Sequence, residues 1–425
     1  MKKLSTIAIL VVSILILFTG CQPSSAKYTE FYENSDFDYK NDMQVMYLTS
    51  GGQLSAPMTK SDTGYYYVAE APQFARMVFY IDKEIRKATP LCSKPNCLHD
   101  DLTKCDAYIN ISQNVKISTS FGASGNIIQY YGGYLYYLGG EYDQSGINYN
   151  TFLMRMDLDG NNKVQLTECF DYHVTHWCLH RGYLYYFTDS ELCRVPIDSI
   201  KSEPSVIYEV EYYIEEAWNT FETMYTYKNY IYFTVLEEDE QGKGPGRQTY
   251  CVNLDTMEKT LITIDGNCAS VEGFTENKVI VSFGDKTGKV YESIDLNGTN
   301  GKEFYYEKRS DVRALSTDNK YFYFDNLSKT VRDSSITQMI TVTDKDCNLV
   351  DTFKLPPLDV RTYNFFVPQD EDFFIFECFN ENDEHVIVMA DKSQIGSING
   401  EVIEYTELCK LKWAQGNSNG IYYTE

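Results

Sequence analysis

The stretch Gly133-Tyr134-Leu135-Tyr136-Tyr137 decides the fold, because similar phrases recur along the whole chain. Each phrase is a polar turn residue followed by a short aromatic or apolar run, which is typical of a β-strand covered on both faces. The runs begin at positions 65, 134, 183, 230, 279, 321, 373 and 421, so the intervals are 69, 49, 47, 49, 42, 52 and 48 residues. A period in the forties built from short strands predicts a β-propeller.

The second repeat shows the plan of one four-stranded antiparallel blade. Strands are expected at residues 126–131, 134–138, 151–157 and 163–167, with Gly132-Gly133 as a two-residue turn that needs positive φ. Aspartate favours tight turns because its side chain bonds the backbone two residues on. The third strand runs into such a residue in all seven complete repeats: Asp82, Asp157, Asp198, Asp255, Asp295, Asp344 and Asp391. No amphipathic helix is evident in the mature chain, so the predicted fold class is all-β.

The number of blades depends on the two ends of the chain. After seven complete repeats, residues 410–425 offer only two further strands, at 412–415 and 421–425. Two strands left alone would expose an edge, and residues 43–54 could supply the missing outer strands. We therefore expect a single β-propeller of eight blades, one of them a composite of both ends. The alternative is seven blades with the terminal hairpin packed elsewhere.

The first interval exceeds the mean of the others by about 21 residues, which indicates an insertion between the first and second blades at residues 91–108. This insertion contains Cys92, Cys97, His99 and Cys105, with the spacing C-x4-C-x-H-x5-C. Three thiolates and one imidazole suit a closed tetrahedral zinc site, and a loop with few apolar residues needs such a cross-link. The alternatives are disulfides, which would need a partner such as Cys169, and free thiols in a reducing habitat.

A second candidate metal site lies in residues 173–180, which hold three of the five histidines of the chain. In a strand, His176, Cys178 and His180 would share one face and could line the central channel. The interpretation that we favour is an inner strand of the third blade in which these side chains are packed.

The N-terminus predicts export. Lys2 and Lys3 precede an apolar run at residues 4–18, which is too short for a comfortable membrane span, and Gly20-Cys21 follows. We expect a signal peptide at residues 1–20, a flexible acidic tether at 21–42 and the propeller at 43–425. The segment before Cys21 resembles the lipobox of bacterial lipoproteins, which implies lipidation of Cys21 and attachment to the outer face of the cell membrane through lipid alone. The alternative is an ordinary secretory peptide.

The chain is strongly acidic, with 37 basic and 61 acidic residues and a formal net charge of −24. Such a charge repels nucleic acid and anionic lipid headgroups, so nucleic acid is excluded as an expected partner. The expected partners are a surface or extracellular protein, a peptide or a glycan.

The order of lipobox, tether and tyrosine-rich blades resembles secreted lipoproteins of clostridial-type bacteria, many of them described only as domains of unknown function. The Cys- and His-bearing insertion resembles a segment that follows the first blade in the same proteins. The repeats are also similar to TolB-like propellers and to the YWTD propellers of lipoprotein-receptor-related proteins, with Tyr186-Phe187-Thr188-Asp189 as the nearest match to that signature. The resemblance implies the fold and the location of the protein.

No nucleophile and base occur in a recognisable catalytic motif, so no catalytic residue is predicted. The function that we expect is a non-enzymatic binding or scaffold module on the cell surface, and no cofactor is expected apart from the structural zinc ion. One alternative is an extracellular carbohydrate-active enzyme that uses carboxylates around the channel. Another is an envelope sensor or a partner of another envelope protein.

Overall fold

The computed structural model describes residues 58–61, 63–70, 76–109, 128–142, 149–168, 170, 176–210, 221–238, 245–284, 288–307, 314–318, 320–325, 339–356, 365–366, 372–382 and 384–411. Several predicted features lie outside these residues: the signal peptide, Cys21, the tether, the strands at 43–54, 412–415 and 421–425, and Cys169 and His173.

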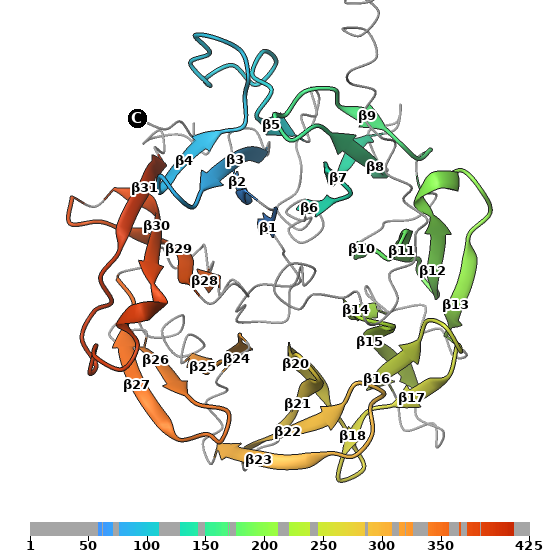
Figure 1. Ribbon diagram of the computed structural model, residues 1–425. Coiled ribbons are helices and arrows are strands. Elements are labelled where there is room, and N and C mark those ends of the chain that lie inside the picture. Colours follow the sequence, from blue (N-terminus) through green and yellow to red (C-terminus); the bar gives the residue numbers. More distant parts are fainter. Residues whose placement is uncertain are drawn as a thin grey trace, which may run out of the picture.

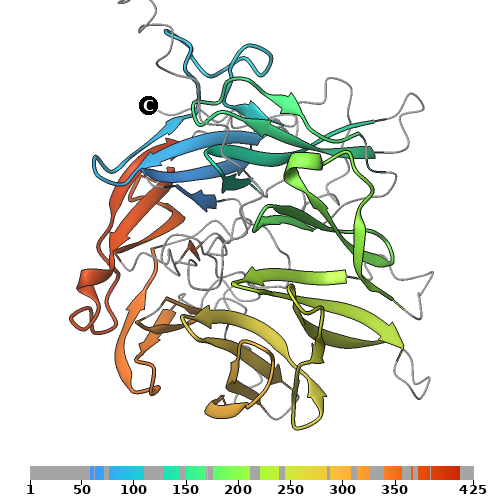
Figure 2. The ribbon, with the colours of Figure 1, turned by 45° about the vertical axis from the view of Figure 1, so that its right-hand side comes forward.

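In the described part of the chain, seven sheets form a ring, each built on four sequential antiparallel strands, with a fifth short strand in the first sheet, and the predicted all-β propeller is therefore confirmed (Figure 1). In every sheet the first strand lies toward the centre and the fourth lies at the periphery. Figure 2 shows the twisted sheets of the same ring turned by 45°. Among the described residues the helices are two short 3-10 turns, η4 (Ile197–Ser199) and η5 (Lys392–Gln394), and neither has the length of a membrane span.

The first four blades are built from the following strands. Blade 1 contains β1 (Met58–Lys60), β2 (Gly64–Glu70), β3 (Arg76–Asp82) and β4 (Lys87–Pro90), with β5 (Tyr108–Ile109) also paired to β3. Blade 2 contains β6 (Ile128–Tyr131), β7 (Tyr134–Tyr142), β8 (Tyr149–Met156) and β9 (Val164–Gln165). Blade 3 contains β10 (Trp177–His180), β11 (Tyr183–Phe187), β12 (Glu191–Pro196) and β13 (Ser205–Glu209). Blade 4 contains β14 (Phe221–Tyr227), β15 (Tyr230–Glu238), β16 (Pro245–Asn253) and β17 (Lys259–Leu261).

A small hairpin, β18 (Thr263–Ile264) and β19 (Asn267–Cys268), leads to the last three blades. Blade 5 contains β20 (Ser270–Thr275), β21 (Lys278–Gly284), β22 (Lys289–Asp295) and β23 (Lys302–Glu307). Blade 6 contains β24 (Ala314–Thr317), β25 (Phe322–Asp325), β26 (Met339–Thr343) and β27 (Leu349–Lys354). Blade 7 contains β28 (Phe365–Phe366), β29 (Phe373–Phe379), β30 (His385–Asp391) and β31 (Thr406–Leu411).

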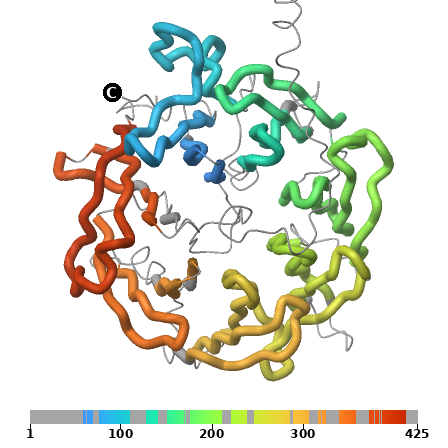
Figure 3. The backbone as a smooth tube through the Cα atoms, viewed as in Figure 1, coloured from blue at the N-terminus to red at the C-terminus, as the bar shows by residue number. Residues whose placement is uncertain are grey.

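The expected eighth, composite blade is wrong, and the alternative of seven blades is correct. Residues 410 and 411, which were assigned to an eighth repeat, belong to β31, the outer strand of blade 7. Blade 7 packs directly on blade 1: the rings of Tyr65 and Phe373 lie 5.6 Å apart in a T-shaped arrangement. An eighth blade therefore has no place between them, and the first and last blades of the described chain lie side by side in the ring (Figure 3).

The recurring aromatic phrase forms the second strand of each blade, where both faces are covered by neighbouring blades. In β2, Tyr65, Tyr67 and Ala69 belong to the core shared with blade 7. The alternate residues Tyr66 and Val68 belong to the core shared with blade 2. Burial on both faces explains why the strand is continuously apolar instead of alternating, since each large side chain that is fully buried contributes roughly 1.5–3 kcal/mol.

The turns behave as their residue types require. Gly132 and Gly133 have φ angles of 54° and 83°, as expected for a tight two-residue hairpin. At the ends of third strands, Asp82 accepts hydrogen bonds from the amides of Glu84 and Ile85 at 2.9 and 3.0 Å. The predicted bond to the backbone two residues on is confirmed at Asp82 and at Asp344, which accepts from the amide of Asp346 at 3.0 Å. In blades 2, 4 and 5 the corresponding bond is made by a neighbouring residue instead, namely Asp159, Asn253 and Asn297.

Candidate metal centre

The insertion interrupts the outer strand of blade 1. The strands β4 and β5 both pair with β3, one after the other along the same edge. At the gap, the amide of Leu91 donates to the carbonyl of Val78, and the amide of Val78 donates to the carbonyl of Ala107, both at 2.8 Å. Residues 91–107 therefore leave and rejoin the sheet at a single residue. The insertion was expected between blades 1 and 2, and the return through β5 places it inside blade 1 instead.

The insertion brings the four predicted ligands together. Each of Cys92, Cys97, His99 and Cys105 offers one donor atom, and these four atoms all lie within 4.8 Å of one another. Within the cluster, His99 Nδ1 and Cys105 Sγ are 3.2 Å apart. In a tetrahedral zinc site with Zn–S bonds of about 2.3 Å, neighbouring sulfur atoms are about 3.8 Å apart. The cluster thus has the dimensions and the donor set of such a site, and its cysteines are thiols rather than disulfides.

Two tight turns place the donors on a common side. The amide of Cys97 donates to the carbonyl of Lys94 at 3.4 Å, and the amide of Cys105 donates to the carbonyl of Asp101 at 3.0 Å. Asn96 and His99 have φ angles of 61° and 57°, in the left-handed region that reverses the chain sharply. The short segment between these turns carries Cys97 and His99 back toward Cys92 and Cys105.

Backbone amides are aimed at two of the sulfur atoms. Burial raises the pKa of the Cys92 thiol, but hydrogen bonds from the amides of Lys94 and Asp106, with those of the neighbouring thiols, outweigh it and lower the pKa. Burial raises the pKa of the Cys105 thiol, while the amide of Ala107 acts in the opposite direction. Amide hydrogen bonds to sulfur are the outer shell that orients metal-bound thiolates. Burial also lowers the pKa of His99, which favours the neutral imidazole that binds metal.

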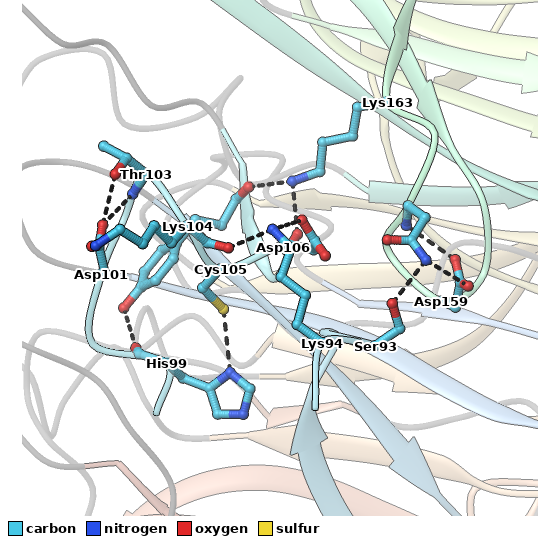
Figure 4. A network of polar contacts seen from close by, with 12 residues as sticks. Ser93, Lys94, His99, Asp101, Thr103, Lys104, Cys105, Asp106, Asp159 and Lys163 are labelled. Atoms are coloured by element: carbon cyan, nitrogen blue, oxygen red, sulfur yellow. Dashed lines mark hydrogen bonds and ion pairs between the residues drawn. The ribbon is translucent and has the colours of Figure 1, made fainter. Parts of the chain in front are cut away.

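A polar frame holds the insertion against blade 2 (Figure 4). The ammonium of Lys163, which lies just before β9, donates to the carbonyls of Asp106 and Tyr108 at 2.7 and 2.6 Å. Its burial lowers the pKa of Lys163. Within the insertion, Lys94 pairs with Asp106 at 2.8 Å, and the hydroxyl of Tyr108 donates to the carbonyl of His99 at 2.8 Å. The sequence contained no signal for the part that Lys163 plays, because a lysine after a turn is common on protein surfaces.

One side of the metal centre is buried and the other is exposed to solvent. Cys105 is only 4% exposed and belongs to the core between blades 1 and 7, and Cys92 and Cys97 pack against that core. On the outer side, a hollow of about 810 Å³ is lined by residues of the insertion from Lys94 to Lys104. Leu98 projects there with 76% of its surface exposed. The ligands are therefore anchored in the molecule while solvent reaches the outer rim of the loop.

The second candidate metal site does not form among the described residues. Of this segment the structure describes residues 176–180, and Trp177–His180 form β10, the inner strand of blade 3, as we favoured. The imidazole Nε2 of His180 donates to the carbonyl of Lys228 at 2.7 Å, and the ring of His176 lies 5.7 Å from that of Phe187. Burial lowers the pKa of both histidines to about 4. Cys178 contacts Thr226 at 3.9 Å, so these side chains serve packing.

A scan against protein-family models finds no match, and no curated protein matches the sequence. Among solved structures, the chain is similar to a puromycin-hydrolysing peptidase of Mycobacterium tuberculosis, with a TM-score of 0.48, 10% identity, and coverage of 90% of this chain and 56% of that one. It is also similar to dipeptidyl peptidase 4 of Porphyromonas gingivalis, with a TM-score of 0.40, 10% identity, and coverage of 84% and 54%. TolB of Acinetobacter baumannii gives a TM-score of 0.36, 12% identity, and coverage of 81% and 82%. The chain spans about half the length of the two peptidases.

Proposed function

We propose that this protein is a non-enzymatic binding or scaffold module, exported and held by lipid at Cys21 on the outer face of the bacterial cell membrane, with a structural zinc ion in the insertion of blade 1. The observation that supports it most is the donor set of Cys92, Cys97, His99 and Cys105. Three sulfur atoms and one nitrogen fill all four positions of a tetrahedral ion. No position remains for a water or a substrate, which is the mark of a structural site and not of a catalytic one.

The chemistry of the donors favours zinc over other ions. Thiolate with imidazole suits zinc, whereas calcium and magnesium take oxygen ligands. Once bound, the ion supplies a cross-link between two turns that have few apolar contacts of their own. The protein residues do the rest: the amides of Lys94, Asp106 and Ala107 orient the sulfur atoms, and Lys163 fixes the returning chain.

Elemental analysis tests the metal part of the proposal. The full chain, purified without oxygen, is expected to contain about one zinc per molecule, and the Cys97→Ser variant is expected to lose most of it. Cys347→Ser is the matched control, because Cys347 is also a partly buried free thiol but lies in a turn of blade 6, away from the cluster. Wild-type protein without metal, or equal zinc in both variants, would contradict the assignment.

The binding role is tested with the folded, zinc-loaded chain immobilised by a tag. Three probes are offered separately: purified cell-wall polysaccharide, the secreted protein fraction, and a peptide mixture from spent medium. Saturable binding of one class, absent with heat-denatured protein, is the expected result. Binding of none of them would count against the proposal, and steady turnover of the polysaccharide would favour the carbohydrate-active alternative.

A further inference from the structure

The ring closes where its first and last blades meet. Blade 1 is built from β1 to β5 and blade 7 from β28 to β31, so neither sheet borrows a strand from the other, and β31 lies beside β4 in this interface. Figure 1 shows the two outer strands next to each other, with the insertion extending from the end of β4. We call this contact between blades 1 and 7 the closing interface. Its described contacts are made by side chains, because each of the two sheets is complete in itself.

The core of the closing interface contains part of the candidate metal centre. From blade 7 it takes Phe373, Ile375 and Leu408, and from blade 1 it takes Tyr65 and Phe79, among others. Three residues of the insertion belong to the same core: Cys105, Ala107 and Tyr108. Three more are partly buried and pack against the edge of this core: Cys92, Cys97 and Leu102. Of the seven core clusters in the described part of the chain, only this one includes a residue of the metal centre.

A fixed conformation of the insertion therefore affects the packing at the closing interface. Residues 91–104 contain no strand or helix of their own, so their conformation depends on the two turns and on whatever joins the donor atoms. A bound ion makes three cysteines and one histidine a single cross-linked unit and removes much of the chain entropy of the loop. This cross-linked loop also contains Cys105 and Leu102, which contact the core of the closing interface.

We propose that the metal centre closes the ring: ion binding by Cys92, Cys97, His99 and Cys105 orders the insertion and thereby stabilises the packing of blade 7 on blade 1. This inference rests on the metal site proposed above. Loss of the ion frees the insertion and exposes one edge of the shared core to water. The ion pair of Arg86 with Asp391 at 2.8 Å also joins the two blades, but its side chains are 39% and 37% exposed, so its contribution is small.

Hydrogen exchange of the full chain measures the coupling directly. The metal content of the sample is determined first, and exchange is then followed with and without a zinc chelator. Removal of the ion is expected to speed exchange about tenfold in residues 91–107 and also in β29, β30 and β31. Strands β15, β16 and β21, on the other side of the ring, are expected to keep their rates.

Two leucines of the insertion provide a matched pair of variants that does not remove a ligand. Leu102 packs against the shared core, whereas Leu98 is exposed. Leu102→Ala is expected to keep the zinc and to speed exchange in β31, and Leu98→Ala is expected to change neither.

The possible failures are distinguishable. A chain that contains no metal overturns both the metal site and the closing role. A zinc-loaded chain in which chelation loosens only residues 91–107, with β31 unaffected by Leu102→Ala, overturns the closing role and leaves the metal site standing.

Discussion

Lys392 and Asp318 form a salt bridge of 2.7 Å between blades 7 and 6, and their side chains are only 3% and 1% exposed. The hydroxyl of Tyr323 donates to the same carboxylate oxygen at 2.5 Å, and the amides of Lys320 and Tyr321 donate to the other oxygen. Burial raises the pKa of Asp318, but the charge of Lys392 and these hydrogen bonds outweigh it and lower the pKa. The carboxylate is thus fully satisfied as an anion.

Substitution of Lys392 by methionine is expected to destabilise the fold by about 3–5 kcal/mol, because the Asp318 charge is left buried and uncompensated. Urea denaturation measures the loss. Lys410→Met is the control, since Lys410 and Glu384 form a pair whose side chains are each 36% exposed, and such pairs contribute about 0–1 kcal/mol. Equal losses in the two variants would show that burial of the first pair has no energetic consequence.

Two buried histidines, His180 in β10 and His176 just before it, predict a loss of stability in mild acid. The pKa values of His176 and His180 are lowered to about 4 by burial, from an ordinary value of about 6.5. The unfolded chain therefore binds more protons than the folded chain between these values, so the free energy of unfolding falls as the pH is lowered through this window. Each histidine is expected to cost up to about 3 kcal/mol by pH 4.

Denaturation midpoints at pH 7.5, 6 and 5 check this expectation. His180→Gln keeps a donor for the carbonyl of Lys228 but does not titrate, so its stability should fall less steeply than that of the wild type. Burial raises the pKa of Glu237, so this residue makes the free energy of unfolding rise as the pH falls. Glu237 is present in both chains, so its contribution cancels in the difference between them. Parallel curves of stability against pH for the two chains would show that His180 does not contribute to the acid sensitivity.

The lipid attachment proposed for Cys21 predicts where the protein is found. Cys21→Ala is expected to move most of the protein from the membrane fraction into the culture medium, because the remaining chain lacks the acyl groups that hold it. Cell fractionation with incorporation of a labelled fatty acid is the measurement, and Gln22→Ala is the neighbouring control. Unchanged membrane association of the Cys21 variant would rule out lipid as the anchor.

The sequence predicted those parts of the molecule that depend on local pattern. The aromatic phrase marks second strands, whose burial on both faces is visible as an unbroken apolar run, as in Tyr65 to Ala69. The excess in one interval located the insertion, and the spacing of four donors within 14 residues identified Cys92, Cys97, His99 and Cys105 as a group. Each of these signals lies in neighbouring residues.

The parts that the sequence missed depend on contacts between distant segments. Counting the aromatic phrases gave eight blades instead of seven. A phrase resembles a second strand whether or not the other three strands of a blade are present. The position of the insertion inside blade 1 depends on the pairing of Tyr108 and Ile109 with β3. The bonds of Lys163 to the insertion join residues 55 and 57 positions apart. No pattern in either segment indicates the other.

The bonding of Leu91 and Ala107 to the one residue Val78 has a consequence for how this loop can change over time. Because departure and return share an attachment point, segments of different length can occupy the gap without shifting the hydrogen-bond register of β3. Deletions and replacements between these two residues are thus tolerated by the sheet itself, and their cost falls on whatever the loop touches. Blade 1 accordingly offers a site at which a ring of similar blades can acquire or exchange an accessory module while its scaffold stays the same.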